Sequence, residues 1–309
     1  MNKYKLVSGT ANVEFSKKVA KFLDKELAEV TVNRFSDGEI NVNISESVRG
    51  QDVFIIQPTC APANDNLMEL LIIVDALKRS SAGTINAVVP YFGYARQDRK
   101  AAPRVPISAK LVADMLETAG VQRVITVDLH AAQIQGFFNI PVDHLVGASL
   151  FVDYIKNKNL PNPIIASPDV GGVARARSYA EKLGYDLVIV DKKREKANES
   201  EVMNIIGEVK DRDVVILDDM VDTAGTLTKA ADVLKAKGAN SVMACCTHGV
   251  LSGPAYDRID KSALDELVIT DTIPQSQIHN KVTVLTAADI TAKAIKRIYT
   301  NESIQSIFI

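Results

Sequence analysis

The sequence has few cysteines, no long apolar segment and almost no excess of charge. Its three cysteines, Cys60, Cys245 and Cys246, are odd in number and lack the paired spacing of zinc ligands, so neither a disulfide framework nor a zinc site is predicted. No apolar run approaches the roughly 20 residues of a membrane-spanning helix, and the N-terminus lacks the apolar core of a secretory signal. We therefore expect a cytoplasmic protein with no membrane partner.

Charge and motif content exclude several ways of binding nucleic acid or nucleotide. The net charge of −2 and the pI near 6.1 provide no global positive field, so no nucleic-acid partner is expected. The sequence also lacks a GxxxxGK(S/T) phosphate loop, a GxGxxG run after a strand and a kinase catalytic loop. Any phosphate must therefore be bound locally and by other elements.

Length and periodicity predict an α/β protein. With 309 residues, 47% of them hydrophobic and 24% charged, the chain has an ordinary globular composition and exceeds the usual size of one core. Short apolar runs alternate with segments of helical periodicity, which predicts mostly parallel sheets. The expected strands lie at residues 5–7, 53–57, 85–89, 124–128, 163–166, 187–191, 214–217, 241–246, 267–269 and 282–285. The expected helices lie at residues 13–23, 66–78, 107–118, 172–183, 227–237 and 287–298.

Two segments of the sequence resemble each other. Residues 48–56, VRGQDVFII, align with residues 209–217, VKDRDVVIL, and each is followed by a threonine-containing loop, a helix and another apolar strand. The pattern predicts an internal duplication into two domains, residues 1–148 and 149–309. Chance similarity between hydrophobic strands is the alternative.

Residues 214–226, VVILDDMVDTAGT, form the most informative stretch. Four aliphatic residues predict a strand buried on both faces, Asp218 and Asp219 follow where it stops, and a small, hydroxyl-rich turn leads into a helix. In an open α/β sheet, ligands bind outside the carboxyl ends of the strands, and the free N–H groups of a helix N-terminus bind anions. The turn is therefore expected to hold a phosphate. The alternative is that the acidic pair only caps a loop.

The turn residues suit a sugar phosphate. Hydroxyl donors, a glycine that lets the backbone approach closely and carboxylates that accept from sugar hydroxyls are all present. The stretch resembles the ribose-5-phosphate binding motif of the phosphoribosyltransferase fold, which implies two similar phosphoribosyltransferase-type, Rossmann-like domains. The resemblance assigns ribose 5-phosphate to Asp218, Asp219, Asp222, Thr223, Ala224, Gly225 and Thr226. In the first copy of the repeat Gln57 and Pro58 replace the acidic pair, so only the second copy is expected to bind ribose phosphate.

A basic loop distinguishes between the two activities that this motif fits, the consumption of phosphoribosyl pyrophosphate (PRPP) and its synthesis. Residues 90–100, PYFGYARQDRK, mix aromatic and cationic side chains after an expected strand. A solvated basic loop is the alternative, but the run closely resembles the ATP-binding loop of the ribose-phosphate diphosphokinase (PRPP synthetase) family. The resemblance assigns Arg96, Gln97 and Asp98 to ATP, with the arginine neutralising phosphate charge.

Residues 34–44, RFSDGEINVNI, read by themselves as a Ser-Asp-Gly turn between strands. They resemble the adenine-contacting hairpin of the same family, in which the turn reaches the nucleotide of a neighbouring subunit. The resemblance therefore places Phe35, Asp37, Gly38 and Glu39 at the ATP site. It also implies a homo-oligomer with a shared ATP site, the hexamer being typical of the family.

Two further strand ends carry candidate metal and phosphate ligands. His130 follows the expected strand at residues 124–128, and the resemblance implies that it helps to hold Mg²⁺ and the ATP phosphates; a structural hydrogen bond is the alternative. SPDVGGVARA resembles the pyrophosphate loop of the family, with Asp169, Val170, Gly171 and Gly172 as its members and Asp169 as a hard oxygen ligand for Mg²⁺.

The segment VDKKREKANESEVM resembles the catalytic loop of the family. The alignment places Lys192 on the catalytic lysine and Arg194 on the catalytic arginine, which also contacts ribose 5-phosphate. Glu195 and Ala197 stand where bacterial members often have prolines, which leaves the stiffness of the loop and the choice between Lys192 and Lys193 open. A solvated lysine run is the alternative.

Five motifs in family order cover the whole chain, so the resemblance implies a PRPP synthetase. Such an enzyme transfers the β,γ-diphosphoryl group of ATP to the C1 hydroxyl of ribose 5-phosphate, giving PRPP and AMP. The alternatives are a phosphoribosyltransferase and a non-catalytic, regulatory relative of the synthetase.

Overall fold

The computed structural model describes residues 4–193, 202–277 and 279–307, and the chain forms two compact units. Unit 1 comprises Met1–Val146, Thr272–Pro274 and Thr286–Ile309, and unit 2 comprises Gly147–Asp271 and Gln275–Leu285. No helix among the described residues is long and apolar enough to cross a membrane. All three cysteines are buried and free of disulfide bonds.

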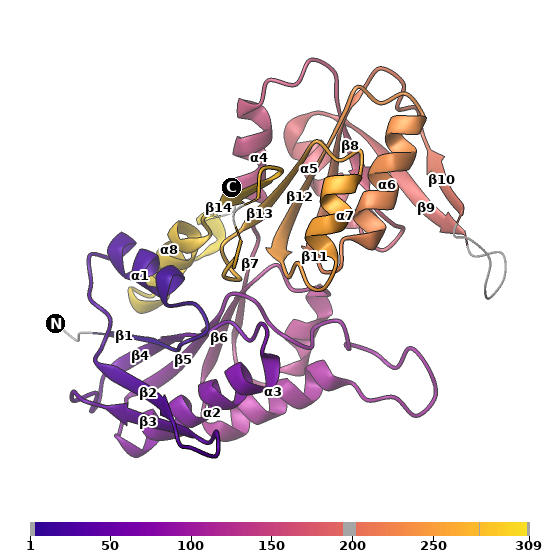
Figure 1. Ribbon diagram of the computed structural model, residues 1–309. Coiled ribbons are helices and arrows are strands. Elements are labelled where there is room, and N and C mark those ends of the chain that lie inside the picture. The colour runs from indigo at the N-terminus through magenta and orange to yellow at the C-terminus, as the bar shows by residue number, and fades with distance from the viewer. Residues whose placement is uncertain (1–3, 194–201, 278, 308–309) are drawn as a thin grey trace. The chain divides into compact units, whose positions relative to one another are not determined.

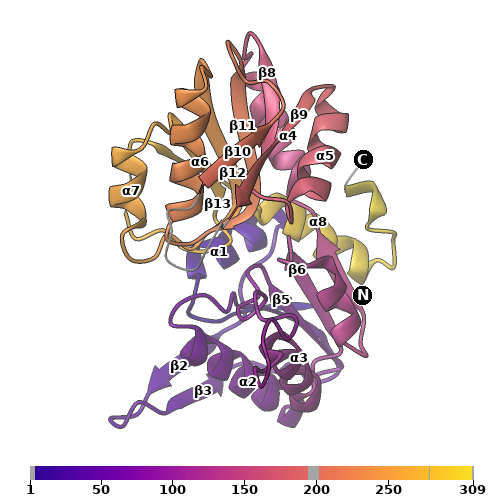
Figure 2. The ribbon, with the colours of Figure 1, turned by 90° about the vertical axis from the view of Figure 1, so that its right-hand side faces the viewer.

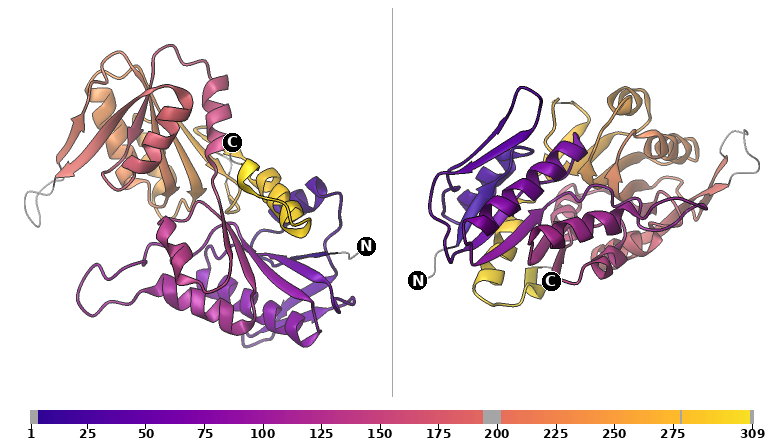
Figure 3. Two further views of the ribbon diagram at one scale, coloured as in Figure 1. Left: turned by 180° about the vertical axis from the view of Figure 1, so that it is seen from behind. Right: turned by 90° about the horizontal axis from the view of Figure 1, so that it is seen from below.

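Unit 1 is built on a five-stranded parallel sheet of order β1-β4-β5-β6-β7. Its strands are β1 (Lys5–Ser8), β4 (Asp52–Ile56), β5 (Thr84–Val89), β6 (Arg123–Val127) and β7 (Val142–Leu145). Helices α2 (Ala63–Arg79) and α3 (Ser108–Ala119) lie side by side on one face, while α1 (Val13–Phe22) and α8 (Ala288–Tyr299) pack together on the other (Figures 1 and 3). Outside the sheet lie the hairpin β2 (Val30–Arg34) and β3 (Ile40–Ile44) and the short helices η1 (Ala132–Phe137) and η2 (Gln305–Ile307).

The C-terminal helix belongs to unit 1, whereas the sequence places residues 149–309 in one C-terminal domain. The physical reason is the apolar and aromatic contact that α8 makes with unit 1. The ring of Tyr299 lies 4.5 Å from the ring of Tyr4, which in turn makes an edge contact with Phe54 of β4.

Unit 2 contains a seven-stranded sheet of order β10-β9-β8-β11-β12-β13-β14, in which all neighbours are parallel except β10 and β9. Its strands are β8 (Pro163–Ser167), β9 (Asp186–Lys193), β10 (Val202–Ile206), β11 (Asp213–Val221), β12 (Ser241–Gly249), β13 (Glu266–Thr270) and β14 (Val282–Leu285). In Figure 2, α6 (Gly225–Ala236) and α7 (Ala255–Lys261) lie along one face and α5 (Val173–Leu183) along the other, where it packs on α4 (Ala148–Asn157).

The two units repeat one topology, as the internal similarity predicts. The order β1-β4-β5-β6-β7 matches β8-β11-β12-β13-β14, and a hairpin precedes the second strand of each series. The register agrees as well, because Val53 pairs with Lys5 in unit 1 as Val214 pairs with Ile164 in unit 2. The two positions that the sequence repeat aligns, Val53 and Val214, therefore have equivalent places in their sheets.

In unit 1, the strand end equivalent to the acidic pair is occupied by side chains that hydrogen-bond to one another. Gln57, fully buried, donates to Glu69 Oε1 at 3.0 Å and accepts the N–H of Ala11 at 3.1 Å. Glu69 also accepts the backbone N–H and the hydroxyl of Thr10, each at 2.6 Å. A buried carboxyl group of unit 1 therefore takes hydrogen bonds from the end of β4 and from the loop after β1.

We expect Glu69→Ala to lower the free energy of unfolding by about 2 kcal/mol, because it removes a buried carboxylate that accepts from the amide of buried Gln57 and from two donors of exposed Thr10. Glu69→Gln keeps an acceptor in place, and the hydroxyl of Thr10 can accept from its amide, so this matched variant should lose less than about 1 kcal/mol. Urea unfolding of both variants tests the expectation. Equal stability of the two variants would contradict it.

Candidate functional site

The acidic pair lies inside β11 rather than where the strand stops, which corrects the sequence expectation. β11 pairs with β8 only as far as Ile216 and Ala166, but it pairs with β12 from Asp213 to Val221. The support from β12 extends the strand past Leu217. Among the described residues, the edge of β11 that faces β8 therefore has no ladder partner from Leu217 onward, just before Asp218 and Asp219.

An arginine that sequence reasoning did not single out bridges the two carboxylates. Arg175 Nη1 lies 3.0 Å from an oxygen of Asp218 and 3.0 Å from an oxygen of Asp219. The backbone N–H of Asp219 also donates to Asp218 Oδ1 at 2.8 Å. The Asp219 side chain is 4% exposed and that of Asp218 is 30% exposed, so a ligand would reach Asp218 first.

Burial and the neighbouring charge of Asp219 raise the pKa of Asp218 to about 7, although Arg175 acts in the opposite direction. The pair therefore exchanges a proton near neutral pH. At neutral pH it can accept hydrogen bonds from sugar hydroxyls, and the ionised fraction grows as the pH rises.

The turn after β11 opens directly into α6. Ala224 has left-handed backbone angles, φ 58° and ψ 3°, and α6 begins at Gly225, two residues before the expected start. Thr226 therefore lies in the first turn of the helix, where backbone N–H groups have no partner within the helix. Thr223 and Thr226 are exposed, and together with Gly225 they line a hollow of about 470 Å³.

The predicted pyrophosphate loop follows β8 in the same unit. Asp169 Oδ1 accepts the backbone N–H of Gly172 at 2.9 Å, and α5 begins at Val173. Val170 and Gly171 are exposed. A Cβ at Gly172 would lie 2.9 Å from the hydroxyl oxygen of Ser167, so this position has no room for a side chain. Arg175 is in the first turn of α5, which explains how the loop and the acidic pair are connected.

The predicted ATP loop lies in unit 1. Arg96 is exposed, the backbone carbonyl and side chain of Gln97 are bonded to the start of α3, and Asp98 accepts from Gln133 of η1 at 3.1 Å. His130 is exposed beyond the end of β6. The N–H of Leu129 donates to His144 Nε2 at 2.9 Å, which fixes the chain beside His130.

The predicted adenine-contacting hairpin is present as β2 and β3. Its turn holds Phe35, Asp37, Gly38 and Glu39; Phe35 is 56% exposed, and Gly38 has a φ of 95° that favours glycine. The N–H of Glu39 donates to Asp37 Oδ1 at 3.1 Å. An exposed ring and two carboxylates at the end of the hairpin are available to a ligand or another chain.

The catalytic-loop residues are described only in part. The backbone of Lys192 lies in β9, opposite Met203 of β10. Arg194 lies outside the described residues. The roles of both residues, and the choice between Lys192 and Lys193, stay predictions.

The described residues fit a magnesium ion that is held largely by phosphates. No group of three or more His, Cys, Asp or Glu side chains gathers in the described part of the chain as a protein-only metal site. Mg²⁺ is commonly bound through one or two carboxylates together with substrate phosphates. Asp169 offers such an oxygen, because a carboxylate that accepts one hydrogen bond keeps further lone pairs. His130, the other residue predicted to hold the ion, belongs to unit 1.

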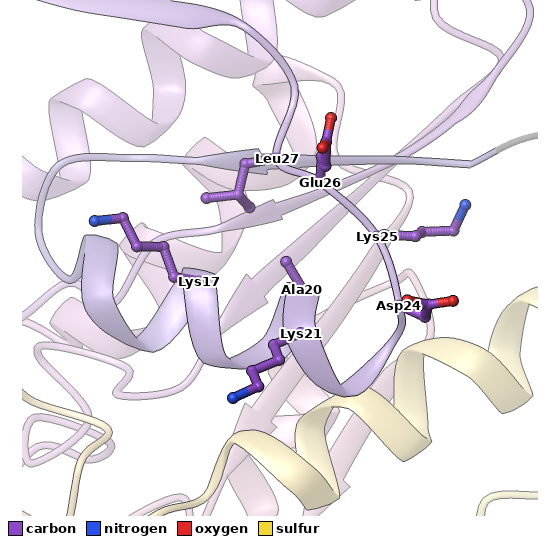
Figure 4. Close-up of a pocket in the computed structure, with 7 residues that line it drawn as sticks. All are labelled: Lys17, Ala20, Lys21, Asp24, Lys25, Glu26 and Leu27. Carbon is purple, nitrogen blue, oxygen red and sulfur yellow. The ribbon is translucent and has the colours of Figure 1, made fainter.

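A separate hollow of about 430 Å³ lies beside α1 in unit 1 (Figure 4). It is lined by Lys17, Ala20, Lys21, Asp24, Lys25, Glu26 and Leu27. Two of its lysines have partners, since Lys17 pairs with Glu14 at 2.7 Å and Lys25 Nζ lies 4.3 Å from the ring centre of Tyr4. No residue predicted to bind a substrate lines this hollow.

Two parallel α/β units, one of them with paired carboxylates and a hydroxylated turn that opens a helix, define a protein of the phosphoribosyltransferase fold. Residues 4–120 match the N-terminal domain of ribose phosphate pyrophosphokinase, and residues 194–309 match the phosphoribosyl synthetase-associated domain. The chain belongs to the ribose-phosphate pyrophosphokinase family, which is the family predicted above under the names diphosphokinase and PRPP synthetase.

Relatives match along the full length. The chain is 67% identical to the ribose-phosphate pyrophosphokinase of Wolinella succinogenes and 65% identical to that of Campylobacter jejuni, each match covering 100% of both chains. It is also similar to the crystal structure of phosphoribosylpyrophosphate synthetase from Mycobacterium smegmatis, at 41% identity and a TM-score of 0.92, covering 97% of this chain and 99% of that one. The predicted family and fold class are thereby confirmed.

We expect Asp218→Asn to be more stable than the unaltered protein at pH 8. The pKa of Asp218 is about 7 in the folded protein and near its ordinary value, 3.8, when unfolded, so its contribution to stability is present below about pH 4 and is lost as the pH rises to 7. An asparagine avoids this loss, and the gain should be about 1 kcal/mol at pH 8 and smaller at pH 5.

Thermal unfolding at the two pH values measures this difference. Asp114→Asn, on the exposed surface of α3, serves as the control because its side chain is 50% exposed. A gain for Asp218→Asn that is the same at both pH values would contradict the expected titration.

Proposed function

We propose that this ribose-phosphate pyrophosphokinase transfers the β,γ-diphosphoryl group of ATP to the C1 hydroxyl of ribose 5-phosphate. The observation that carries the proposal is the acidic pair of β11, joined by a short turn to the N-terminus of α6. Carboxylates that accept from sugar hydroxyls stand next to exposed hydroxyls and N–H groups that suit a phosphate. A ribose carrying a 5-phosphate has both groups.

The acceptor is held by unit 2. Asp218 and Asp219 orient the ribose hydroxyls, while Asp222, Thr223, Ala224, Gly225 and Thr226 surround the 5-phosphate. Gly225 brings the backbone close to the phosphate, and Thr223 and Thr226 add hydroxyl donors. Arg175 keeps the two carboxylates from moving apart. The C1 hydroxyl is thereby fixed relative to the strand end.

The donor is bound by groups from several segments. Arg96, Gln97 and Asp98 bind ATP, and the hairpin residues Phe35, Asp37, Gly38 and Glu39 reach the base from a neighbouring subunit. This sharing of the site is the reason for proposing a homo-oligomer, with the hexamer as its form. The loop Asp169, Val170, Gly171 and Gly172 holds the pyrophosphate portion through its exposed backbone.

The chemistry is an in-line displacement at the β-phosphorus. The C1 oxygen forms a bond to the β-phosphorus, the bond from that phosphorus to the α-phosphate oxygen breaks, AMP leaves and the hydroxyl proton passes to water. Such a transfer depends on positioning and on neutralising charge. Lys192 and Arg194, with Arg96, neutralise charge on the transferring group and on AMP. Asp169 and His130 would hold Mg²⁺, which neutralises the charge of the triphosphate when it is bound.

Incubation of the chain with ATP, Mg²⁺ and ribose 5-phosphate tests the proposal. AMP and PRPP should form in equal amounts, and AMP should not form when ribose 5-phosphate is left out. A phosphoribosyltransferase would instead need a base and would not consume ATP, and a regulatory relative would form neither product. We propose the cytoplasm as the location, since ATP is available there.

We expect Lys192→Ala to lower kcat by about 10²–10³-fold, because it removes a cation that stabilises charge developing in the transition state. Ribose 5-phosphate should still bind with nearly unchanged affinity, since its site is on β11 and α6. Lys193→Ala is the matched control and should keep most of the turnover. Near-normal turnover of Lys192→Ala together with a large loss for Lys193→Ala would move the role to Lys193.

We expect Thr226→Val to raise KM for ribose 5-phosphate about tenfold, because a phosphate oxygen loses a hydroxyl donor while the side chain keeps its shape. KM for ATP should change less than twofold. Thr300→Val at the end of α8 removes an exposed hydroxyl elsewhere and serves as the control. An unchanged KM for ribose 5-phosphate would remove Thr226 from the site.

A further inference from the structure

The turn assigned to the 5-phosphate is held from behind by one segment, residues 250–258. The carbonyl groups of residues 221 and 222 accept the backbone N–H groups of residues 250–252 at 2.9 to 3.1 Å. The next carbonyl, that of Thr223, accepts Arg258 Nη1 at 2.9 Å. Ser252 also donates its hydroxyl to the carboxylate of Asp222. Three consecutive carbonyls are therefore bonded on one side.

Arg258 is the only one of these donors that is a cationic side chain, and it lies directly against the turn. A Cβ at Gly225 would lie 3.0 Å from Arg258 Nη1, so the guanidinium group fills the space behind this glycine. The helix that carries Arg258 is itself fixed, because Lys281 Nζ donates to the carbonyls of Ile259, Asp260 and Ser262 at 3.1 to 3.3 Å. Lys281 thus anchors the C-terminal end of α7, the helix from which Arg258 reaches the turn.

The charge of the surroundings favours an anion. The hollow of about 470 Å³ that Thr223, Gly225 and Thr226 line is also lined by Lys229, Arg258 and Lys261 and by one carboxylate, Asp232. The carboxylate is partly engaged elsewhere, because Asp232 Oδ1 accepts the N–H of Ala263 at 2.7 Å. Lys261 is paired with Asp257 at 3.6 Å, so its charge is balanced outside the hollow. The other two cations, Lys229 and Arg258, against one carboxylate give a local positive potential next to the N-terminus of α6.

We propose that Arg258 is a positioning residue for the 5-phosphate of ribose 5-phosphate. Its hydrogen bond to the carbonyl of Thr223 turns that peptide so that the following N–H groups face the phosphate, and its charge strengthens their donation. The inference rests on the proposed function, because it concerns the same turn. In this proposal, α7 contributes to phosphate binding together with the motif in residues 222–226.

Steady-state kinetics of Arg258→Ala, Arg258→Lys and Arg258→Gln test the proposal. Arg258→Ala should raise KM for ribose 5-phosphate about tenfold, as expected for loss of one charged hydrogen bond, with kcat and KM for ATP changed less than threefold. The lysine variant, which keeps the charge and one donor, should recover part of the loss and the glutamine variant less. Lys261→Ala, in the same hollow but 80% exposed and paired with Asp257, should leave KM for ribose 5-phosphate within twofold.

The outcomes separate the inference from the function on which it rests. Arg258 is exposed, so truncating it opens no core, and unfolding curves of the three variants check this point. A KM for ribose 5-phosphate within twofold of the unaltered protein in Arg258→Ala would overturn the inference, as would a parallel rise in KM for both substrates. If Thr226→Val raises KM for ribose 5-phosphate while Arg258→Ala does not, only the inference fails. If neither variant does, the assignment of the turn fails as well.

Discussion

Two carboxylates on adjacent residues of a buried strand repel each other, and the structure of unit 2 around the candidate site depends on how this repulsion is balanced. Arg175 supplies the balancing charge, with one nitrogen 3.0 Å from each carboxylate. Because one cation faces two anions, the pKa of Asp218 remains raised, to about 7. The same arginine is in the first turn of α5, so the loop of Asp169 to Gly172 cannot move far without disturbing the acidic pair.

The duplicated topology shows which residues take the place of the acidic pair in unit 1, where no sugar is expected. In unit 1 the end of β4 carries Gln57, and the group it faces is Glu69, whose carboxyl is fully surrounded by donors. At this strand end, unit 1 therefore pairs the buried polar groups of Gln57 and Glu69 with one another and with neighbouring residues of the unit. In unit 2 the equivalent strand end keeps Asp218 partly exposed, so its hydrogen-bonding capacity is available to a ligand. One fold thus gives a closed strand end in one copy and an open one in the other.

The sequence predicted most of the sheet and the consecutive part of the site. All ten expected strands are present, since short runs rich in Val, Ile and Leu are a local signal, and the hairpin at residues 34–44 was predicted from its turn. β7, β10, α4 and α7 were not predicted. β7, β10 and α7 have only four, five and seven residues, too few for a clear periodicity, and α4 follows directly on the expected domain boundary. The acidic pair was placed beyond the strand, since the support that β12 gives to residues 218–221 leaves no mark in the sequence of β11.

Arg175 and Arg258 show why the rest of the site could not be predicted. Arg175 lay within a recognised loop, and only its position in the first turn of a helix beside β11 would have suggested that it faces the strand end. Arg258 lies 35 residues after Thr223, and only the packing of α7 beside α6 brings them together. Residues that touch a ligand tend to cluster in a motif, whereas residues that orient the motif come from wherever the fold places them.

The turn itself shows why such orientation is needed. Ala224 is held at a φ of 58°, a left-handed conformation that costs an alanine about 1–2 kcal/mol, and the next residue is a glycine with high backbone entropy. Without outside support, a turn of this kind would sample other conformations and present its N–H groups to a phosphate only part of the time. The hydrogen bonds from residues 250–258 to three successive carbonyls offset that tendency before any substrate arrives. Since diphosphoryl transfer gains its rate from positioning, rigidity on the far side of the turn contributes to the chemistry on the near side.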